Sequence, residues 1–335
     1  DEAAGLLAQT RLLTVAGPGG MGKTRFALAL AERVAGRFED GVYFVELQPV
    51  SDAGLVPSAI LEALSLREDP NRPIERTVVD HLSSRSALLV IDNCERVRDG
   101  CARIVERLLR ACPRLRIVPT TRIVLSVPGE TTFRLSSLQE NDAVALFCER
   151  ARAAVPAYEL TPDDAGIIAG IVRKLDGIPL AVELAAARTR VMSLQTLDRR
   201  LEELMRETAA GGSRTQPTLR AALDWSYEYL SAQERMLFER LAVFAGSLTL
   251  EAAESVCGGD GLAAGNILDL LTVLVDNSLV QFERHGEATR FRYLDTVRAY
   301  ALEKFAVSPA RERIRAAHAH WFVSFVEGLE PKLYD

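Results

Sequence analysis

A glycine-rich segment, GPGGMGKT at residues 17–24, has the residue types and spacing of a phosphate site. It fits G-x-x-x-x-G-K-[ST], in which Lys23 reaches the β- and γ-phosphates and the Thr24 hydroxyl binds Mg²⁺. Backbone without side chains can turn several N–H groups toward one phosphate chain, and the positive end of a following helix adds to the attraction. The segment therefore predicts a site for a nucleoside di- or triphosphate. The residues predicted to line it are Gly17, Pro18, Gly19, Gly20, Met21, Gly22, Lys23, Thr24 and Arg25.

A second segment, ALLVIDNCE at residues 87–95, is expected to complete the metal site. Its apolar run predicts a buried strand that ends at Asp92, whose carboxylate would orient a water on Mg²⁺ beside Thr24. Many hydrolysing ATPases of this kind place an acidic base directly after this aspartate, but Asn93 stands here and an amide cannot take a proton from water. Glu95 either serves as the base or simply begins the next helix. We predict slow or partner-dependent ATP hydrolysis.

Two further residues are candidates for contacts with the nucleotide. Arg122, in TTR at residues 120–122, could sense a γ-phosphate through charge-assisted hydrogen bonds, or could be an exposed loop arginine. Pro179, in GIPLAVELAAAR at residues 177–188, could begin a helix that lies against an adenine base. A Gly-x-Pro break taken alone indicates only a kink.

The elements that must position these residues alternate along the first 135 residues. Short apolar runs at 11–16, 41–47, 86–92, 115–120 and 131–135 predict strands, and helical patterns separate the first four. This alternation is typical of a parallel sheet with crossover helices, buried on both faces. From residue 139 onward the pattern is helical, with a linker expected at 207–218 and a strand hairpin turning at His285-Gly286.

We therefore predict four parts. An α/β P-loop NTPase domain spans residues 1–137, an all-α helical domain 138–215, a winged-helix domain 216–306, and the helical start of a C-terminal sensor region 307–335. Four aromatic residues sit at helical spacing with leucines and are expected to pack in the core. They are Trp225, Phe238, Phe244 and Trp321.

Composition limits the remaining choices. The net charge of -6 over 335 residues argues against a non-specific grip on nucleic acid or anionic lipid across the whole surface. The five cysteines are odd in number and lack C-x-x-C spacing, so we expect buried thiols in a reducing compartment. Neither a signal peptide nor an apolar run of about 18 residues is evident, which predicts a cytoplasmic protein with no membrane partner. Both ends read as cut, so we expect a piece of a longer protein.

These elements, in this order, resemble the STAND class of P-loop ATPases, within it the NB-ARC branch, and most closely the module of bacterial multidomain transcriptional regulators. The resemblance covers nearly the whole chain and rests on blocks such as RLLTVAGPGGMGKTRFALALA, LLVIDNCERV and RFRYLDTVRAYALEKF. It implies three domains that close over ADP and that open, often with oligomerisation, when ATP replaces it. It also implies an effector domain before the module and a sensor domain after it, with DNA or RNA polymerase reached only through domains missing here.

The resemblance also implies roles for single residues. Thr24 and Asp92 hold the metal, Arg122 takes the sensor role, and Pro179 packs near adenine. Animal and plant relatives reach the β-phosphate through the histidine of a Met-His-Asp triplet, and the matching place here reads Tyr-Leu-Asp at 293–295. Because leucine donates no hydrogen bond, Arg298, one helical turn further on, is expected to substitute.

Two other classes share part of this pattern. A DNA-handling ATPase of the origin-binding or loader type also joins a P-loop domain to a winged helix. Its groove-reading helix would here be GNILDLLTVLVDNS, which holds Asp269 and Asp276 but no lysine or arginine and would repel phosphates. A small-molecule kinase is the third class, and the chain after residue 138 offers no evident carboxylates or arginine pair to hold an acceptor.

Overall fold

The computed structural model describes residues 1–155, 161, 164–210, 217–285 and 288–333. The chain divides into two compact units, Asp1–Ser136 and Ser137–Asp335. Each unit has its own packing and is described by itself.

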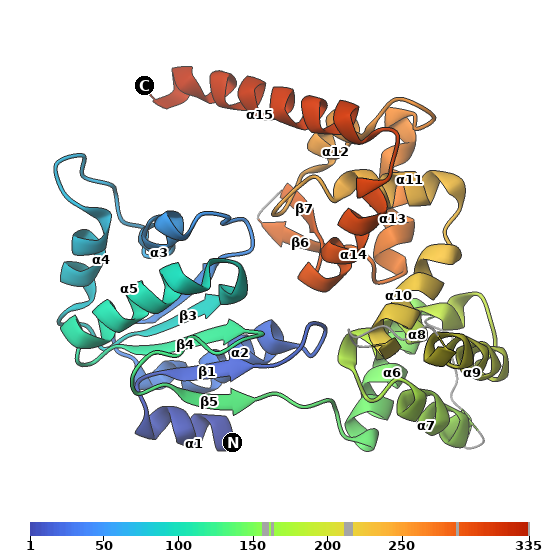
Figure 1. Ribbon diagram of the computed structural model, residues 1–335, viewed down its shortest axis with the longest axis horizontal. Coiled ribbons are helices and arrows are strands. Elements are labelled where there is room, and N and C mark those ends of the chain that lie inside the picture. Colours follow the sequence, from blue (N-terminus) through green and yellow to red (C-terminus); the bar gives the residue numbers. More distant parts are fainter. Residues whose placement is uncertain (156–160, 162–163, 211–216, 286–287, 334–335) are drawn as a thin grey trace. The chain divides into compact units, whose positions relative to one another are not determined.

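The first unit is built on a five-stranded sheet in the order β2-β3-β4-β1-β5, and every strand pair in it is parallel (Figure 1). The predicted parallel sheet with crossover helices is confirmed, and each strand begins and ends within two residues of its expected bounds. The strand that precedes the glycine-rich loop, β1, lies between β4 and β5 rather than beside β3. The strands are β1 Leu13–Ala16, β2 Val42–Glu46, β3 Leu88–Asp92, β4 Arg116–Thr121 and β5 Thr131–Arg134.

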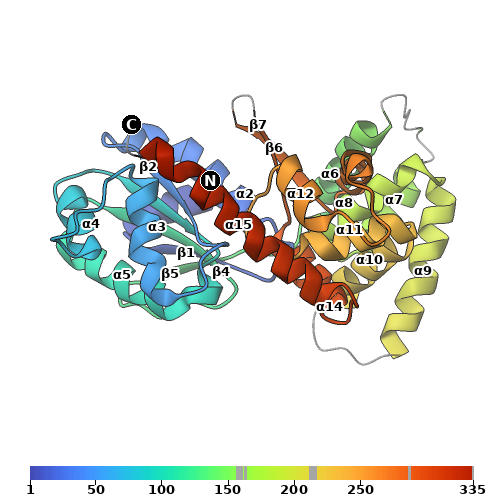
Figure 2. The ribbon, with the colours of Figure 1, turned by 90° about the horizontal axis from the view of Figure 1, so that it is seen from above.

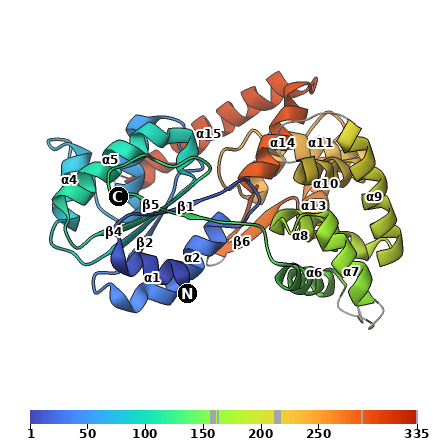
Figure 3. The same cartoon turned by 60° about the horizontal axis from the view of Figure 1, so that its bottom comes forward.

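Helices cover both faces of this sheet (Figure 3). Alternate residues of β3 show why the strand is apolar throughout: Leu88 and Val90 pack under α1 and α2, whereas Leu89 and Ile91 pack under α3, α4 and α5. One face is covered by α1 Glu2–Gln9 and α2 Lys23–Val34, and the other by α3 Val56–Ala63, α4 Ile74–Leu82 and α5 Arg98–Ala111. Short 3-10 turns precede or follow these helices at η1 Ala35–Arg37, η2 Ala53–Leu55 and η3 Cys94–Val97.

The second unit begins with a helical bundle (Figure 2). Its helix α9 is longer than expected, because residues 207–210, which were predicted to belong to a linker, form the last part of the helix. Glutamate and alanine in that stretch favour helix, which corrects the linker prediction there. The predicted linker is also wrong at 217–218, which begin the next helix, and residues 211–216 lie outside the described part. The bundle consists of α6 Glu140–Ala154, α7 Asp164–Lys174, α8 Pro179–Ala187, η4 Arg188–Arg190 and α9 Leu194–Ala210.

A winged helix-turn-helix follows the bundle. The predicted hairpin is confirmed as an antiparallel pair, β6 and β7, although the glycine of its expected turn falls in 286–287, outside the described residues. Ser231 and Glu234 form the predicted capping box at the start of α11. The elements are α10 Pro217–Glu228, α11 Ala232–Leu241, α12 Leu250–Cys257, η5 Ala264–Asn266, α13 Ile267–Asp276, β6 Gln281–His285, β7 Ala288–Arg292, α14 Asp295–Ala306 and α15 Arg311–Leu333.

Arg188 joins the bundle to the winged helix. Its side chain is buried, and its guanidinium carbon lies 5.7 Å from the ring centre of Trp225 and 5.1 Å from that of Tyr229. It donates hydrogen bonds of 3.0 Å to the Asn277 side-chain oxygen, after α13, and to the Ser226 carbonyl in α10. Burial lowers the pKa of Arg188 to about 10, so the group stays charged at neutral pH. Stacking and neutral acceptors stabilise this buried cation.

Three of the four predicted core aromatic residues are buried, and the prediction for Trp321, in the last helix, is wrong. Trp321 is half-buried and stacks on Phe325, which is 49% exposed. The helix α15 buries Ile314 near its start, but residues 322–327 are all exposed. Among the described helices, none is both long enough and apolar enough to span a bilayer.

At Gly100 the packing of α5 against η2 leaves no room for a side chain. A Cβ at this position in α5 would stand 2.4 Å from the Ala53 carbonyl oxygen of η2, so backbone would have to move. We expect Gly100→Ala to lower the free energy of unfolding in urea by about 1–3 kcal/mol, the usual cost of overpacking. Gly5→Ala is the matched control, because its Cβ meets nothing within 4 Å and alanine favours helix. Equal stability of the two variants would contradict this packing.

Candidate functional site

The glycine-rich loop runs from the end of β1 to the start of α2. The Gly17 N–H donates to the Thr121 carbonyl of β4 over 3.2 Å, and a Cβ on Gly17 would stand 3.1 Å from the Leu135 carbonyl oxygen. Gly20 and Gly22 take left-handed backbone angles, with φ of 79° and 80°, which L side chains rarely adopt. The helix α2 then begins at Lys23. The loop thus has a conformation that favours glycine, directly before a helix N-terminus.

Lys23 folds back over this loop. Its ammonium donates to the Pro18 carbonyl over 3.0 Å, and the residue is only 8% exposed. The ammonium therefore lies against the backbone of the loop.

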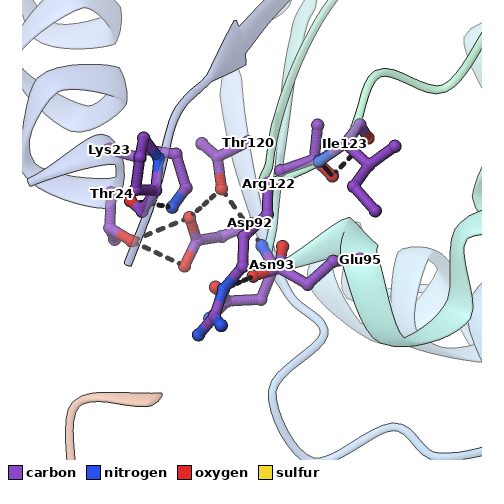
Figure 4. A network of polar contacts seen from close by, with 10 residues as sticks. Lys23, Thr24, Asp92, Asn93, Glu95, Thr120, Arg122 and Ile123 are labelled. Atoms are coloured by element: carbon purple, nitrogen blue, oxygen red, sulfur yellow. Dashed lines mark hydrogen bonds and ion pairs between the residues drawn. The ribbon is translucent and has the colours of Figure 1, made fainter. Parts of the chain in front are cut away.

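Thr24 and Asp92 meet at the carboxyl ends of the strands (Figure 4). The Thr24 hydroxyl lies 2.9 Å from both carboxylate oxygens of Asp92, which is 2% exposed. A hydroxyl and a carboxylate are the oxygen ligands that Mg²⁺ takes beside nucleotide phosphates. The residues present therefore fit a nucleotide with Mg²⁺, which the P-loop fold implies.

Thr120 is a polar partner that the sequence reasoning missed. Its hydroxyl, fully buried at the end of β4, donates to an Asp92 carboxylate oxygen and accepts the Asn93 N–H over 3.1 Å (Figure 4). In the segment TTR, sequence reasoning selects only the arginine. The available signal was the position of the hydroxyl at a strand end. The contact of Thr120 with Asp92 depends on β4 lying between β1 and β3, and the sequence did not indicate this strand order.

The two residues with uncertain roles form a pair. Arg122 Nε lies 3.1 Å from a Glu95 carboxylate oxygen; the arginine side chain is 42% exposed and the glutamate side chain 15%. Glu95 lies in η3, reached through Asn93, whose φ of 64° is left-handed. The pair joins the end of β4 to the turn that follows β3. The roles of these residues as base and sensor stay predictions.

A buried thiol follows the aspartate. Burial raises the pKa of Cys94 well above its usual value, with Cys101 nearby as a further cause. The thiol is therefore neutral at physiological pH and adds no negative charge beside Asp92.

Pro179 and Arg298 belong to the second unit. Pro179 is the first residue of α8, as predicted. Arg298 donates through Nε to the Phe244 carbonyl over 2.7 Å. That either residue approaches a nucleotide stays a prediction.

Comparison with known families agrees with this arrangement. Residues 7–134 match a family described as an AAA domain, and residues 230–306 match a winged helix-turn-helix domain. The chain is 39% identical over 318 residues to the uncharacterized protein Rv0894 of Mycobacterium tuberculosis, covering 93% of this chain and 81% of that protein. The chain belongs to the family of Rv0894.

Longer relatives and a solved structure extend the comparison. The chain is 40% identical to the putative HTH-type transcriptional regulator Rv0890c of Mycobacterium tuberculosis, over 97% of its own length but 37% of the regulator's. The crystal structure of PH0952 from Pyrococcus horikoshii, a STAND protein with a tetratricopeptide repeat sensor, aligns with 96% of this chain and 44% of that one, with a TM-score of 0.58 and 18% identity. The likeness to PH0952 shows the fold alone. The predicted P-loop ATPase fold with a winged helix is confirmed, and the NB-ARC branch stays a prediction.

The Thr120 hydroxyl is expected to stabilise the first unit. We expect Thr120→Val to lower the free energy of unfolding by about 1–3 kcal/mol, because the Asn93 N–H loses its acceptor and Asp92 loses a donor in a dry environment. Thr120→Ser, which keeps the hydroxyl, serves as the control and should stay within about 1 kcal/mol of the wild type. Urea unfolding measures both variants. A valine variant as stable as the serine variant would mean that this hydroxyl does not support Asp92.

Proposed function

We propose that this chain is the ADP/ATP-dependent switch module of a transcription-regulating ATPase. The observation that carries the proposal is the partly buried contact of Thr24 with Asp92, which joins the glycine-rich loop to the carboxylate that would hold the metal. The names of its relatives as HTH-type transcriptional regulators support the regulatory part. The chain spans 37% of such a regulator, so effector and sensor domains would be supplied by the full-length protein.

In this proposal the loop and helix α2 hold the nucleotide. The N–H groups between Gly17 and Gly22 surround the phosphates, and Lys23 neutralises their charge. Thr24 and Asp92 would hold Mg²⁺, which neutralises phosphate charge when bound. Because the hydroxyl and carboxylate bond each other in the structure, binding at this point exchanges their mutual contact for contacts to the ion.

The Arg122–Glu95 pair gives this site a way to distinguish ATP from ADP. A third phosphate would offer Arg122 a stronger partner than the carboxylate that holds it at 3.1 Å. Glu95 would then be free to accept a proton from water, which suits slow hydrolysis in a site with Asn93 in the usual base position. A swing of the switch from 1:99 to 99:1 needs a preference of roughly 10⁴-fold for one state.

The winged helix is proposed to transmit the change rather than to read DNA. Its α13 carries Asp269 and Asp276, and Asp276 forms an ion pair with Arg190 of the helical bundle. In the wing, Arg292 lies 2.7 Å from Glu283, so its charge is offset. DNA or RNA polymerase would then be contacted by domains outside this chain, and oligomerisation would accompany the ATP state. Salt-sensitive binding of the chain to duplex DNA would favour the DNA-handling alternative instead.

Small-angle X-ray scattering tests the switch. We expect different scattering profiles for the wild type with Mg·ADP and with a slowly hydrolysed Mg·ATP analogue, because each nucleotide favours its own domain arrangement. The Lys23→Ala variant is the control, and its profiles should superimpose at a nucleotide concentration that saturates the wild type but stays below the Kd of the variant. Superimposed profiles for the wild type, at nucleotide concentrations shown to saturate it, would contradict the switch.

A further inference from the structure

A cavity of the first unit lies at the amino ends of the strands. Its volume is about 390 Å³, and four arginines line it. Arg11 precedes β1, Arg37 ends the turn after α2, Arg114 lies between α5 and β4, and Arg116 begins β4. Because the strands are parallel and the glycine-rich loop follows the carboxyl end of β1, the cavity and the loop lie at opposite ends of the sheet.

Arginine charges line this cavity without a lining carboxylate, although the Asp40 carboxylate accepts the N–H of Ser86, one of the lining residues, over 2.7 Å. No aspartate or glutamate is among the residues that line it, and none of the four arginines forms an ion pair with a described residue. Three of them instead donate to main-chain carbonyls: Arg11 to Leu109 over 2.8 Å, Arg37 over 3.2 Å and Arg116 over 3.2 Å. These bonds orient the guanidinium groups without cancelling their charge.

The guanidinium groups keep donors for a ligand. Each has five N–H donors, and the carbonyl bonds engage one nitrogen on each of three arginines. A carbonyl acceptor is also neutral, so four positive charges remain at one cavity of a chain whose net charge is -6. Such a concentration of arginines favours a multiply charged anion, and the planar guanidinium matches phosphate oxygens in pairs.

Buried apolar side chains lie behind the arginines. Leu7 of α1, Val34 at the end of α2 and Phe38 are buried side chains that line the same cavity. A volume near 390 Å³ is within the range of about 300–1,000 Å³ that small-molecule sites occupy. Four positive charges around a cavity of this size suit a small molecule with phosphate groups.

We propose that this cavity is a second anion site, which binds a small polyphosphate-bearing molecule independently of the glycine-rich loop. The site would take the phosphate groups through Arg11, Arg37, Arg114 and Arg116. Because it opens at the other end of the sheet, its ligand would not compete for the loop that holds the nucleotide.

Titration calorimetry with inorganic tripolyphosphate tests this site. The Lys23→Ala variant, in Mg²⁺-free buffer, serves as the background, so that the glycine-rich loop contributes little to the measured binding. The result therefore does not depend on whether the nucleotide switch exists. We expect tripolyphosphate to bind this background, and Arg114→Glu added to it to raise the Kd at least about tenfold through loss of charge-assisted hydrogen bonds. Arg114 is chosen because it is exposed and donates no described hydrogen bond that folding needs.

Arg67→Glu on the same background is the matched control, since this exposed arginine lies outside the cavity and the charge change is the same. Its Kd should change less than about threefold, as expected of a screened distant charge. Absence of tripolyphosphate binding, or equal losses in the Arg114 and Arg67 variants, would overturn the proposal. If tripolyphosphate binds, comparing its Kd with that of a nucleoside triphosphate on the same variants will show whether the ligand is a nucleotide or a free polyphosphate.

Discussion

The structure of the first unit depends on one buried carboxylate. Asp92 is 2% exposed, and a carboxylate removed from water is costly unless hydrogen-bond donors surround it. Thr24 and Thr120 supply hydroxyls from α2 and β4, so the aspartate ties the end of β3 to the glycine-rich loop across an intervening strand. The residues that would hold a metal therefore also hold this end of the sheet together. A substitution of Asp92 would therefore remove contacts that join β3, β4 and α2.

Sequence reasoning succeeded where the signal was local. The loop with Lys23 and Thr24, the strand that ends at Asp92 and the alternation of strands and helices all lie within short windows of sequence. Thr120 was missed because its role depends on strand order, which is set by how the crossovers pack and not by any one segment. The pairing of Arg122 with Glu95 joins two segments 27 residues apart, and no periodicity indicates such a partner.

The arginine cavity was unpredictable for a related reason. Its four arginines stand at positions 11, 37, 114 and 116, and only the parallel topology brings the amino ends of the strands and the carboxyl ends of the helices together. The same topology places the glycine-rich loop at the carboxyl ends. In the two proposals, one sheet would bind phosphates at both ends by different means: main-chain N–H groups with one lysine at one end, and guanidinium groups at the other.

In the proposed switch, main-chain N–H groups and Lys23 bind a nucleotide whose metal is held by Thr24 and Asp92. Equilibrium titration of the wild type with ADP, with and without Mg²⁺, tests this binding most directly. We expect Mg·ADP to bind, and Lys23→Ala to weaken it by about 10- to 100-fold, since hydrogen bonds to charged groups contribute about 1.5–3 kcal/mol. No detectable affinity of the wild type for ADP or ATP, or an unchanged Kd in the alanine variant, would contradict the account.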